Sequence, residues 1–174
     1  IVGYFVNMLV LRAQLDKNPT FITFLNQVRQ TVSEALVHQD YPFALLVKQL
    51  QPNRDPSRSP LFQTSFAFQK PQQSEEISER LAELFLGATD QNIRVNLGGL
   101  ELEPFEIKQQ EGQFDLDLEM VETKNALVGV FKYNTDLFER ATIERMIAHF
   151  QTLLTGIVAN PQAPIHKLPL LTEA

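Results

Sequence analysis

Apolar residues that recur three and four positions apart predict two long helices. The first spans residues 20–39, where these positions share one helical face, and Asn18 or Thr20 is expected to cap its start. The second begins near residue 139 or 142 and runs to 159. It is expected to end just before Pro161, because proline disfavours helical geometry in the residue that precedes it.

A shorter helix is predicted between these two. It starts at Pro42, whose fixed φ and missing N–H suit a first helical turn, and it runs to about Leu50. Asp40 lies just upstream and is expected to cap it. Three prolines follow among Asn, Asp and Ser residues, so residues 51–60 are expected to form a structured turn or loop.

Strands are predicted where apolar residues alternate or form a β-branched run. The run from Phe5 to Leu15 is expected to be a largely buried strand, with Asn7 as its polar exception. In residues 61–69, phenylalanines occupy one face and small or polar side chains the other. Further strands are expected at about 93–97 with 100–109, at 113–122 and at 126–134.

The connections between these strands differ in character. Lys124 and Asn125 supply a turn between the last two strands, which predicts an antiparallel pair. Residues 70–92 contain a Gln, Ser and Glu cluster and are expected to be an exposed excursion prone to disorder.

This order of elements describes an α/β fold. A strand, two helices, a strand, an excursion, several strands and a final helix predict a two-layer sandwich. Its sheet is expected to be mixed and largely antiparallel, with the helices on one face. The 174 residues, 44% of them hydrophobic, suffice for one core of ordinary size and are too few for two comfortable domains.

Composition narrows the function classes. A net charge of −6 without any Lys/Arg block argues against a nucleic-acid partner. Cysteine is absent, so neither a disulfide nor a thiolate nucleophile can form, which fits a cytoplasmic protein. No apolar run approaches the roughly 20 residues that cross a bilayer, so no membrane span is expected. The first residue is Ile1, which suggests a piece excised from a longer polypeptide.

Three blocks of sequence carry a resemblance to a known family. They are IVGYFVNMLVLR at 1–12, HQDYPFALLV at 38–47 and RDPSRSPLF at 54–62. In this order and near this spacing, they resemble the later motifs of the condensation domains of nonribosomal peptide synthetases, including those in polyketide–peptide hybrids. The catalytic HHxxxDG motif of that family does not occur in the 174 residues.

The resemblance covers essentially the whole chain and implies a domain organisation. Residues 1–164 are expected to form the carboxy-terminal lobe of a chloramphenicol-acetyltransferase-like fold, two of whose lobes make one condensation domain. Residues 165–174 are expected to be a linker, since LPLLTEA is similar to the segment that leads into a following adenylation domain.

The implied activity is peptide (amide) bond formation between a carrier-bound acyl or peptidyl thioester and a carrier-bound aminoacyl thioester. The expected partners are the amino-terminal lobe, upstream and downstream carrier proteins with their phosphopantetheine arms, and an adjacent adenylation domain. No directly bound cofactor is expected. The isolated chain is expected to be inactive and to self-associate through its lobe-facing surface.

Two other functions stay open at this point. The piece could be a non-catalytic module that docks a carrier protein or serves as a scaffold. It could also come from a relative that epimerises or cyclises instead of condensing. Whether the fragment counts as an enzyme therefore stays open as well.

No catalytic residue is predicted within the chain. His149 and His166 have no Ser or Asp partner at motif spacing, so a hydrolase triad is not supported. The acidic row Asp115, Asp117 and Glu119 is expected to be a solvated face rather than a metal site, because side chains along one strand do not enclose a cation.

Asn7 is the first candidate for a functional residue. By resemblance, it lies near the tunnel between the lobes and contributes a hydrogen-bonding group there. Its alternative is a structural hydrogen bond at a sheet edge or cap, since an unsatisfied buried carboxamide costs about 1–3 kcal/mol. Gln63 and Ser65 share one face of their predicted strand and are expected either to border the same tunnel or to face solvent.

The two remaining blocks supply motif residues. A structural role is expected for five neighbours in the second block, namely His38, Asp40, Tyr41, Pro42 and Phe43. In the third block, Arg54 and Arg58 are candidates for contact with a phosphopantetheine arm or a carrier protein, because a planar cation suits phosphate. The alternative is a self-satisfied loop in which Asp55 bonds backbone amides and a neighbouring Arg.

Overall fold

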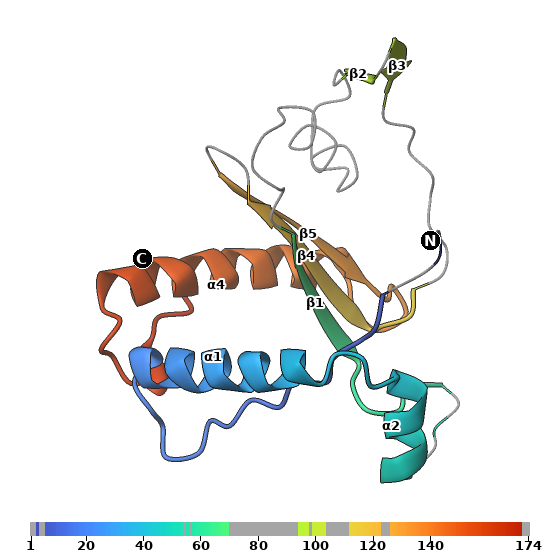
Figure 1. Ribbon diagram of the computed structural model, residues 1–174. Coiled ribbons are helices and arrows are strands. Elements are labelled where there is room, and N and C mark those ends of the chain that lie inside the picture. The colour runs from blue at the N-terminus through green and yellow to red at the C-terminus, as the bar shows by residue number, and fades with distance from the viewer. Residues whose placement is uncertain are drawn as a thin grey trace. The chain divides into compact units, whose positions relative to one another are not determined.

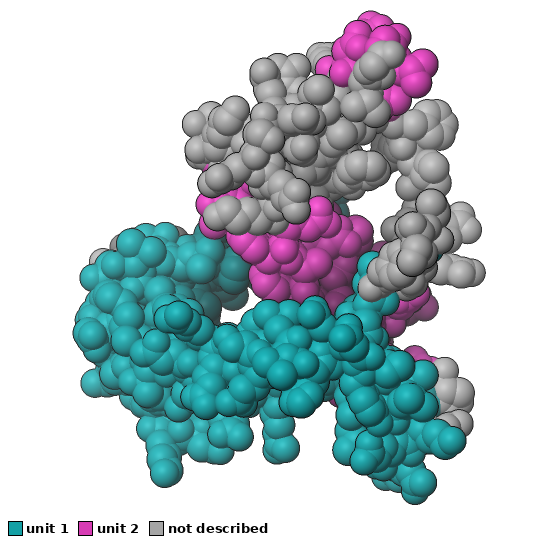
Figure 2. Space-filling view, viewed as in Figure 1, with its two compact units in different colours: residues 1–55, 139–174 teal, residues 56–138 magenta. Residues whose placement is uncertain are grey.

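The computed structural model describes residues 3, 6–53, 55, 57–69, 94–97, 99–103, 112–122 and 126–171 (Figure 1). The chain divides into two compact units, which Figure 2 shows in different colours. Unit 1 contains residues 1–55 and 139–174, and unit 2 contains residues 56–138.

Two long helices form most of unit 1, as the sequence predicts. Helix α1 is Phe21–Val37 and helix α4 is Arg140–Ala159. Of the two caps considered for α1, Thr20 is the one observed: its side chain accepts a hydrogen bond from the backbone N–H of Thr23. Helix α4 ends where Asn160 precedes the proline, which confirms the predicted stop.

The short helix α2 is Phe43–Leu50, and its start corrects one prediction. Pro42 itself occupies the cap position, with φ −64° and ψ 133°, and it forms no side-chain cap hydrogen bond. Asp40 therefore lies two residues before the cap position and is not the cap. The cause is Pro42, whose extended backbone delays the first helical residue by one position.

The C-terminal segment folds against the beginning of α1. The backbone N–H groups of Phe21 and Ile22 donate to the carbonyl oxygens of Ala163 and Pro161. Residues Ile165–Lys167 form a short 3-10 helix, η1, and Leu168 beyond it is buried. The tail is thus folded with unit 1 as far as Leu168, and its continuation as a linker stays a prediction.

The predicted strand at the N-terminus is not formed in the described residues. Residues 6–15 are extended chain without strand pairing, and Val6 and Leu15 are 64% and 57% exposed. A strand requires hydrogen bonds to a neighbouring strand. None of the described strands pairs with this segment, so the prediction of a buried strand is wrong for residues 6–15.

Unit 2 is built around a small mixed sheet, as predicted. Its strands are β1 (Thr64–Gln69), β4 (Leu116–Glu122) and β5 (Leu127–Tyr133), in the order β1-β4-β5. Strand β4 lies in the middle, parallel to β1 and antiparallel to β5, which confirms the expected antiparallel pair. The register places Ser65 opposite Asp117 and Asp117 opposite Lys132.

A separate two-stranded ladder completes the described part of unit 2. Strands β2 (Val95–Leu97) and β3 (Leu100–Leu102) pair antiparallel through a turn that contains Gly99, whose φ is +91°. The predictions for residues 70–92 and for the Lys124-Asn125 turn fall outside the described residues.

Burial is thin across the described residues. Three hydrophobic side chains are buried: Val121 in β4, Ile143 in α4 and Leu168 after η1. In β1 the predicted alternation is present, but the aromatic face is the open one, since Phe66 and Phe68 are 62% and 49% exposed. No helix among the described residues is long and apolar enough to cross a membrane.

Candidate functional site

Polar contacts gather at two places, one in each unit. In unit 1, the side chain of Asn7 reaches residues 39–43. In unit 2, charged and hydroxyl side chains form a row across the three-stranded sheet, beside an open groove. Each place contains residues that the sequence singles out.

Asn7 uses both ends of its carboxamide on the backbone ahead of α2. Its Nδ2 donates to the carbonyl oxygens of Gln39 and Tyr41, each at 2.8 Å. Its Oδ1 accepts the backbone N–H of Phe43 at 3.2 Å. We call these three hydrogen bonds the Asn7 clamp. The structural alternative considered for Asn7 is therefore present, and a tunnel role stays a prediction.

The clamp meets a need that the local sequence creates. The first N–H groups of a helix have no partner within the helix and are usually satisfied by a capping side chain. Pro42 at the cap position carries no hydrogen-bonding side chain. The N–H of Phe43 is satisfied instead by Asn7, which is 36 residues earlier in the chain.

The other motif residues around α2 have structural positions. His38 ends α1 as its C-cap residue, and its backbone N–H donates to Ala35 at 3.0 Å. The hydroxyl of Tyr41 donates to Gln49 Oε1 at 2.9 Å, which ties the approach to α2 to the helix itself.

The groove in unit 2 has a volume of about 1110 Å³. It lies where the loops before β1 and β4 meet the end of β5. Its walls combine aromatic rings with charged and amide side chains, including Arg58, Gln63, Asp117, Glu119 and Lys132. This mixture suits a polar, extended ligand better than a wholly apolar one.

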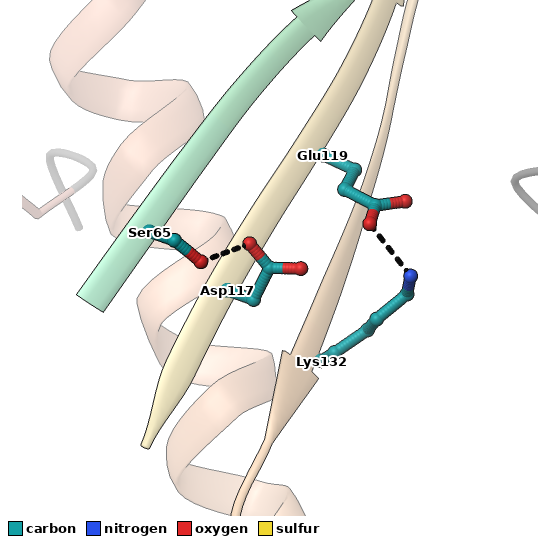
Figure 3. Close-up of polar contacts among 4 residues, drawn as sticks. All are labelled: Ser65, Asp117, Glu119 and Lys132. Carbon is teal, nitrogen blue, oxygen red and sulfur yellow. Dashed lines mark hydrogen bonds and ion pairs between the residues drawn. The ribbon is translucent and has the colours of Figure 1, made fainter. Parts of the chain in front are cut away.

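The polar row crosses all three strands of the sheet (Figure 3). Ser65 in β1 donates its hydroxyl proton to Asp117 Oδ1 in β4 at 2.5 Å. Lys132 in β5 forms an ion pair with Glu119 Oε1 in β4 at 2.7 Å. The side chains of Lys132 and Glu119 are 46% and 25% exposed, so the pair is screened by water and contributes little to stability.

The acidic row predicted from alternation is thus only partly as expected. Asp115, Asp117 and Glu119 are half-buried rather than a freely solvated face. The reason is pairing across the sheet, because Ser65 and Lys132 cover two of the three carboxylates. Among the described residues, no group of three or more His, Asp or Glu side chains could hold a metal ion.

The structure separates the candidate residues of the sequence. Gln63 lines the groove, and its Nε2 donates to the carbonyl oxygen of Ser59 at 3.1 Å. Arg58 also lines the groove. Ser65 is engaged with Asp117 in the adjoining polar row. Asp55 belongs to unit 1, and Arg54 falls outside the described residues.

Sequence reasoning missed Lys132 and the contact between Asn18 and His166. Lys132 occurs in an otherwise apolar strand, and its spacing from the acidic row could have indicated a cross-strand ion pair. Asn18 Nδ2 lies beside His166 Nδ1, and Asn18 Oδ1 accepts the backbone N–H of His166. No local pattern links two residues 148 positions apart.

The sequence and the fold are similar to those of known proteins. The family described as Condensation domain matches residues 1–174. One of the linear gramicidin synthase proteins of Brevibacillus parabrevis is 42% identical over 173 residues, which cover 98% of this chain and 2% of that protein. Chondramide synthase from Chondromyces crocatus is 37% identical over 99% of this chain and 4% of its own length.

A solved structure agrees with the sequence comparisons. A four-domain nonribosomal peptide synthetase, crystallised in its holo form with AMP and glycine, matches 91% of this chain and 12% of its own. The TM-score is 0.76 at 33% identity. The X-domain from teicoplanin biosynthesis shares the fold, with a TM-score of 0.72 at 21% identity.

These matches define the class as a condensation domain of a nonribosomal peptide synthetase, with the α/β, chloramphenicol-acetyltransferase-like fold. This chain belongs to the condensation domain family. It spans 2 to 4% of the length of the curated relatives named above.

Proposed function

We propose that the chain is the carboxy-terminal half of a condensation domain that forms amide bonds in nonribosomal peptide synthesis. One observation carries the proposal: the family match extends over residues 1–174, yet the HHxxxDG motif does not occur among them. The histidine that the resemblance implies for catalysis therefore comes from the amino-terminal lobe, and this chain is inactive alone.

The proposed reaction joins two tethered substrates. The amine of the aminoacyl thioester attacks the carbonyl carbon of the acyl or peptidyl thioester and loses a proton. The carbon–nitrogen bond forms, the carbon–sulfur bond breaks, and the donor's phosphopantetheine leaves as a thiol. The contribution of this chain is to hold the two substrates in a reactive orientation, which supplies a large part of the barrier reduction in such reactions.

Within this function, the groove and polar row of unit 2 belong to the wall of the substrate tunnel. Gln63 presents an amide to the groove, and Ser65 borders the adjoining row. Arg58 lines the groove with a guanidinium group, which suits the phosphate of a phosphopantetheine arm. Arg54 in the same motif is proposed for the same kind of contact.

The partners follow from the same proposal. They are the amino-terminal lobe, the upstream and downstream carrier proteins and an adenylation domain after residues 165–174. The parent synthetase is placed in the cytoplasm. The likeness to a four-domain synthetase supports a multidomain context.

The test is an amide-forming assay with the complete condensation domain of the parent synthetase. Donor and acceptor carrier proteins are loaded separately, mixed with the domain, and the thioesters are analysed by mass spectrometry. The proposal predicts a new amide on the acceptor carrier and a free thiol on the donor carrier. The matched control uses an acceptor carrier without its phosphopantetheine arm, which gives no product.

Other products would contradict the proposal in a recognisable way. An inverted stereocentre in the donor would indicate an epimerising relative, and loss of a further water would indicate cyclisation. If loaded carriers bind but remain unchanged, the domain is a docking module.

A further inference from the structure

The Asn7 clamp joins two segments of unit 1 that are distant in sequence. One is the extended chain around residue 7, and the other is the backbone of residues 39–43 that leads into α2. Helix α2 has eight residues, a length at which a helix is not stable by itself in water. Its start therefore depends on contacts from elsewhere, and the clamp supplies three.

We infer that Asn7 is a positioning residue for the condensation reaction, acting through the backbone of residues 39–43. This inference rests on the proposed function, in which the chain forms one wall of the substrate tunnel. The carboxamide holds the start of α2 at a fixed distance from the extended segment.

Only one side-chain chemistry fits the clamp. Two of its acceptors are carbonyl oxygens and its donor is an N–H, so the side chain must offer two N–H donors and one acceptor together. A carboxamide does so. A carboxylate has the same shape but offers acceptors alone, so it would face the carbonyls of Gln39 and Tyr41 with like partial charges.

The consequence for the reaction is geometric. Displacement of a reacting group by about 1 Å can cost on the order of 100-fold in rate when two substrates must be aligned. Loss of the clamp frees the approach to α2, while the contact between Tyr41 and Gln49 still ties that approach to the helix. The segment therefore moves as a piece and is not expected to unfold.

The experiment compares Asn7→Asp and Asn7→Ala in the complete condensation domain. The rate of amide formation is measured at saturating loaded carriers and divided by the folded fraction, which is determined by circular dichroism. Asn96→Asp is the matched control, because Asn96 uses only its Oδ1, which accepts the N–H of Gly99 at 3.1 Å. Aspartate keeps that acceptor and adds the same charge.

Both Asn7 variants are expected to lose about 10- to 100-fold in rate per folded molecule, with little change in KM for the loaded carriers. Relative to the unsubstituted domain, Asn7→Asp recovers part of its rate as the pH falls from about 8 to about 6. A protonated carboxyl regains one O–H donor, and a site with two carbonyl oxygens favours the protonated form. Asn7→Ala shows no such recovery, and Asn96→Asp keeps the full rate.

The inference is overturned if folded Asn7→Asp molecules work at the full rate, or if the loss follows the folded fraction alone. Failure of the proposed function would look different, because the unsubstituted domain would then form no amide.

Discussion

Thr20 determines where α1 begins. Its side-chain oxygen accepts the backbone N–H of Thr23 at 3.2 Å, and its carbonyl oxygen accepts that of Phe24 at 2.9 Å. Asn18, the other expected cap, adopts a positive φ of 49° and bonds His166 in the tail. Both residues are typical caps in sequence, and a partner far along the chain decides between them.

Replacement of Thr20 by valine keeps the shape of the side chain and removes the capping oxygen. We expect Thr20→Val to lower the free energy of unfolding of the complete domain by about 1 kcal/mol, measured by urea denaturation. Thr20→Ser keeps the hydroxyl and serves as the matched control, with a much smaller loss. Equal stability of Thr20→Val and the unsubstituted domain would show that this cap contributes nothing.

Sequence reasoning at the level of single residues found the important side chain and could not find its partners. A polar Asn7 within an apolar run signals that its carboxamide must be satisfied somewhere. Its partners lie 32 to 36 residues away, on backbone atoms that carry no sequence signal of their own. The same limit hid the contact between Asn18 and His166.

Helix α4 packs tightly against the tail at one small residue. A Cβ placed on Gly156 would lie 2.5 Å from Cγ of Pro169, closer than carbon atoms approach in folded proteins. Glycine in the middle of a helix is usually unfavourable, by about 1 kcal/mol relative to alanine. Its presence here is explained by the close approach of the proline ring.

Gly156→Ala is therefore expected to destabilise the complete domain, although it improves helix propensity. Overpacking against a stiff ring costs about 1–3 kcal/mol, which outweighs the propensity gain or cancels it. The double variant Gly156→Ala with Pro169→Ala removes the ring and should be more stable than Gly156→Ala alone. Thermal unfolding of the variants gives both comparisons, and a rise in Tm for Gly156→Ala alone would contradict the packing argument.

Elements with local causes were the easiest to predict. Helices α1 and α4 depend on apolar spacing, caps and a terminating proline, all of which are visible in sequence. The strand expected from Phe5 to Leu15 depends on a pairing partner, which composition does not reveal. Residues 6–15 have the expected residue types and no described strand beside them.

At the scale of the whole molecule, the described chain leaves large apolar side chains open to solvent. Val37 at the end of α1 and Val158 at the end of α4 are 78% and 82% exposed, and Phe66 in β1 is exposed as well. Such surfaces are typical of protein pieces that meet a partner. They support the expected contact with an amino-terminal lobe, and self-association of the isolated chain stays a prediction.

The family was predictable because three short motifs occur in order, although no single one contains a reacting group. The groove was not, because its residues come from the loops before β1 and β4 and from β5, more than 60 positions apart in sequence at the extremes. Alternation in residues 113–122 placed the acidic side chains on one face, whereas their pairing with Ser65 and Lys132 needed the register of the sheet.

Complementation tests the central claim most directly. The complete condensation domain is compared with this chain alone, and with this chain mixed with the separately produced amino-terminal lobe, using the same loaded carrier proteins and detection of the new amide. The account predicts product from the complete domain, none from this chain alone, and restored product when the two lobes associate. Amide formation by this chain alone would contradict the claim that it supplies one lobe and no catalytic histidine.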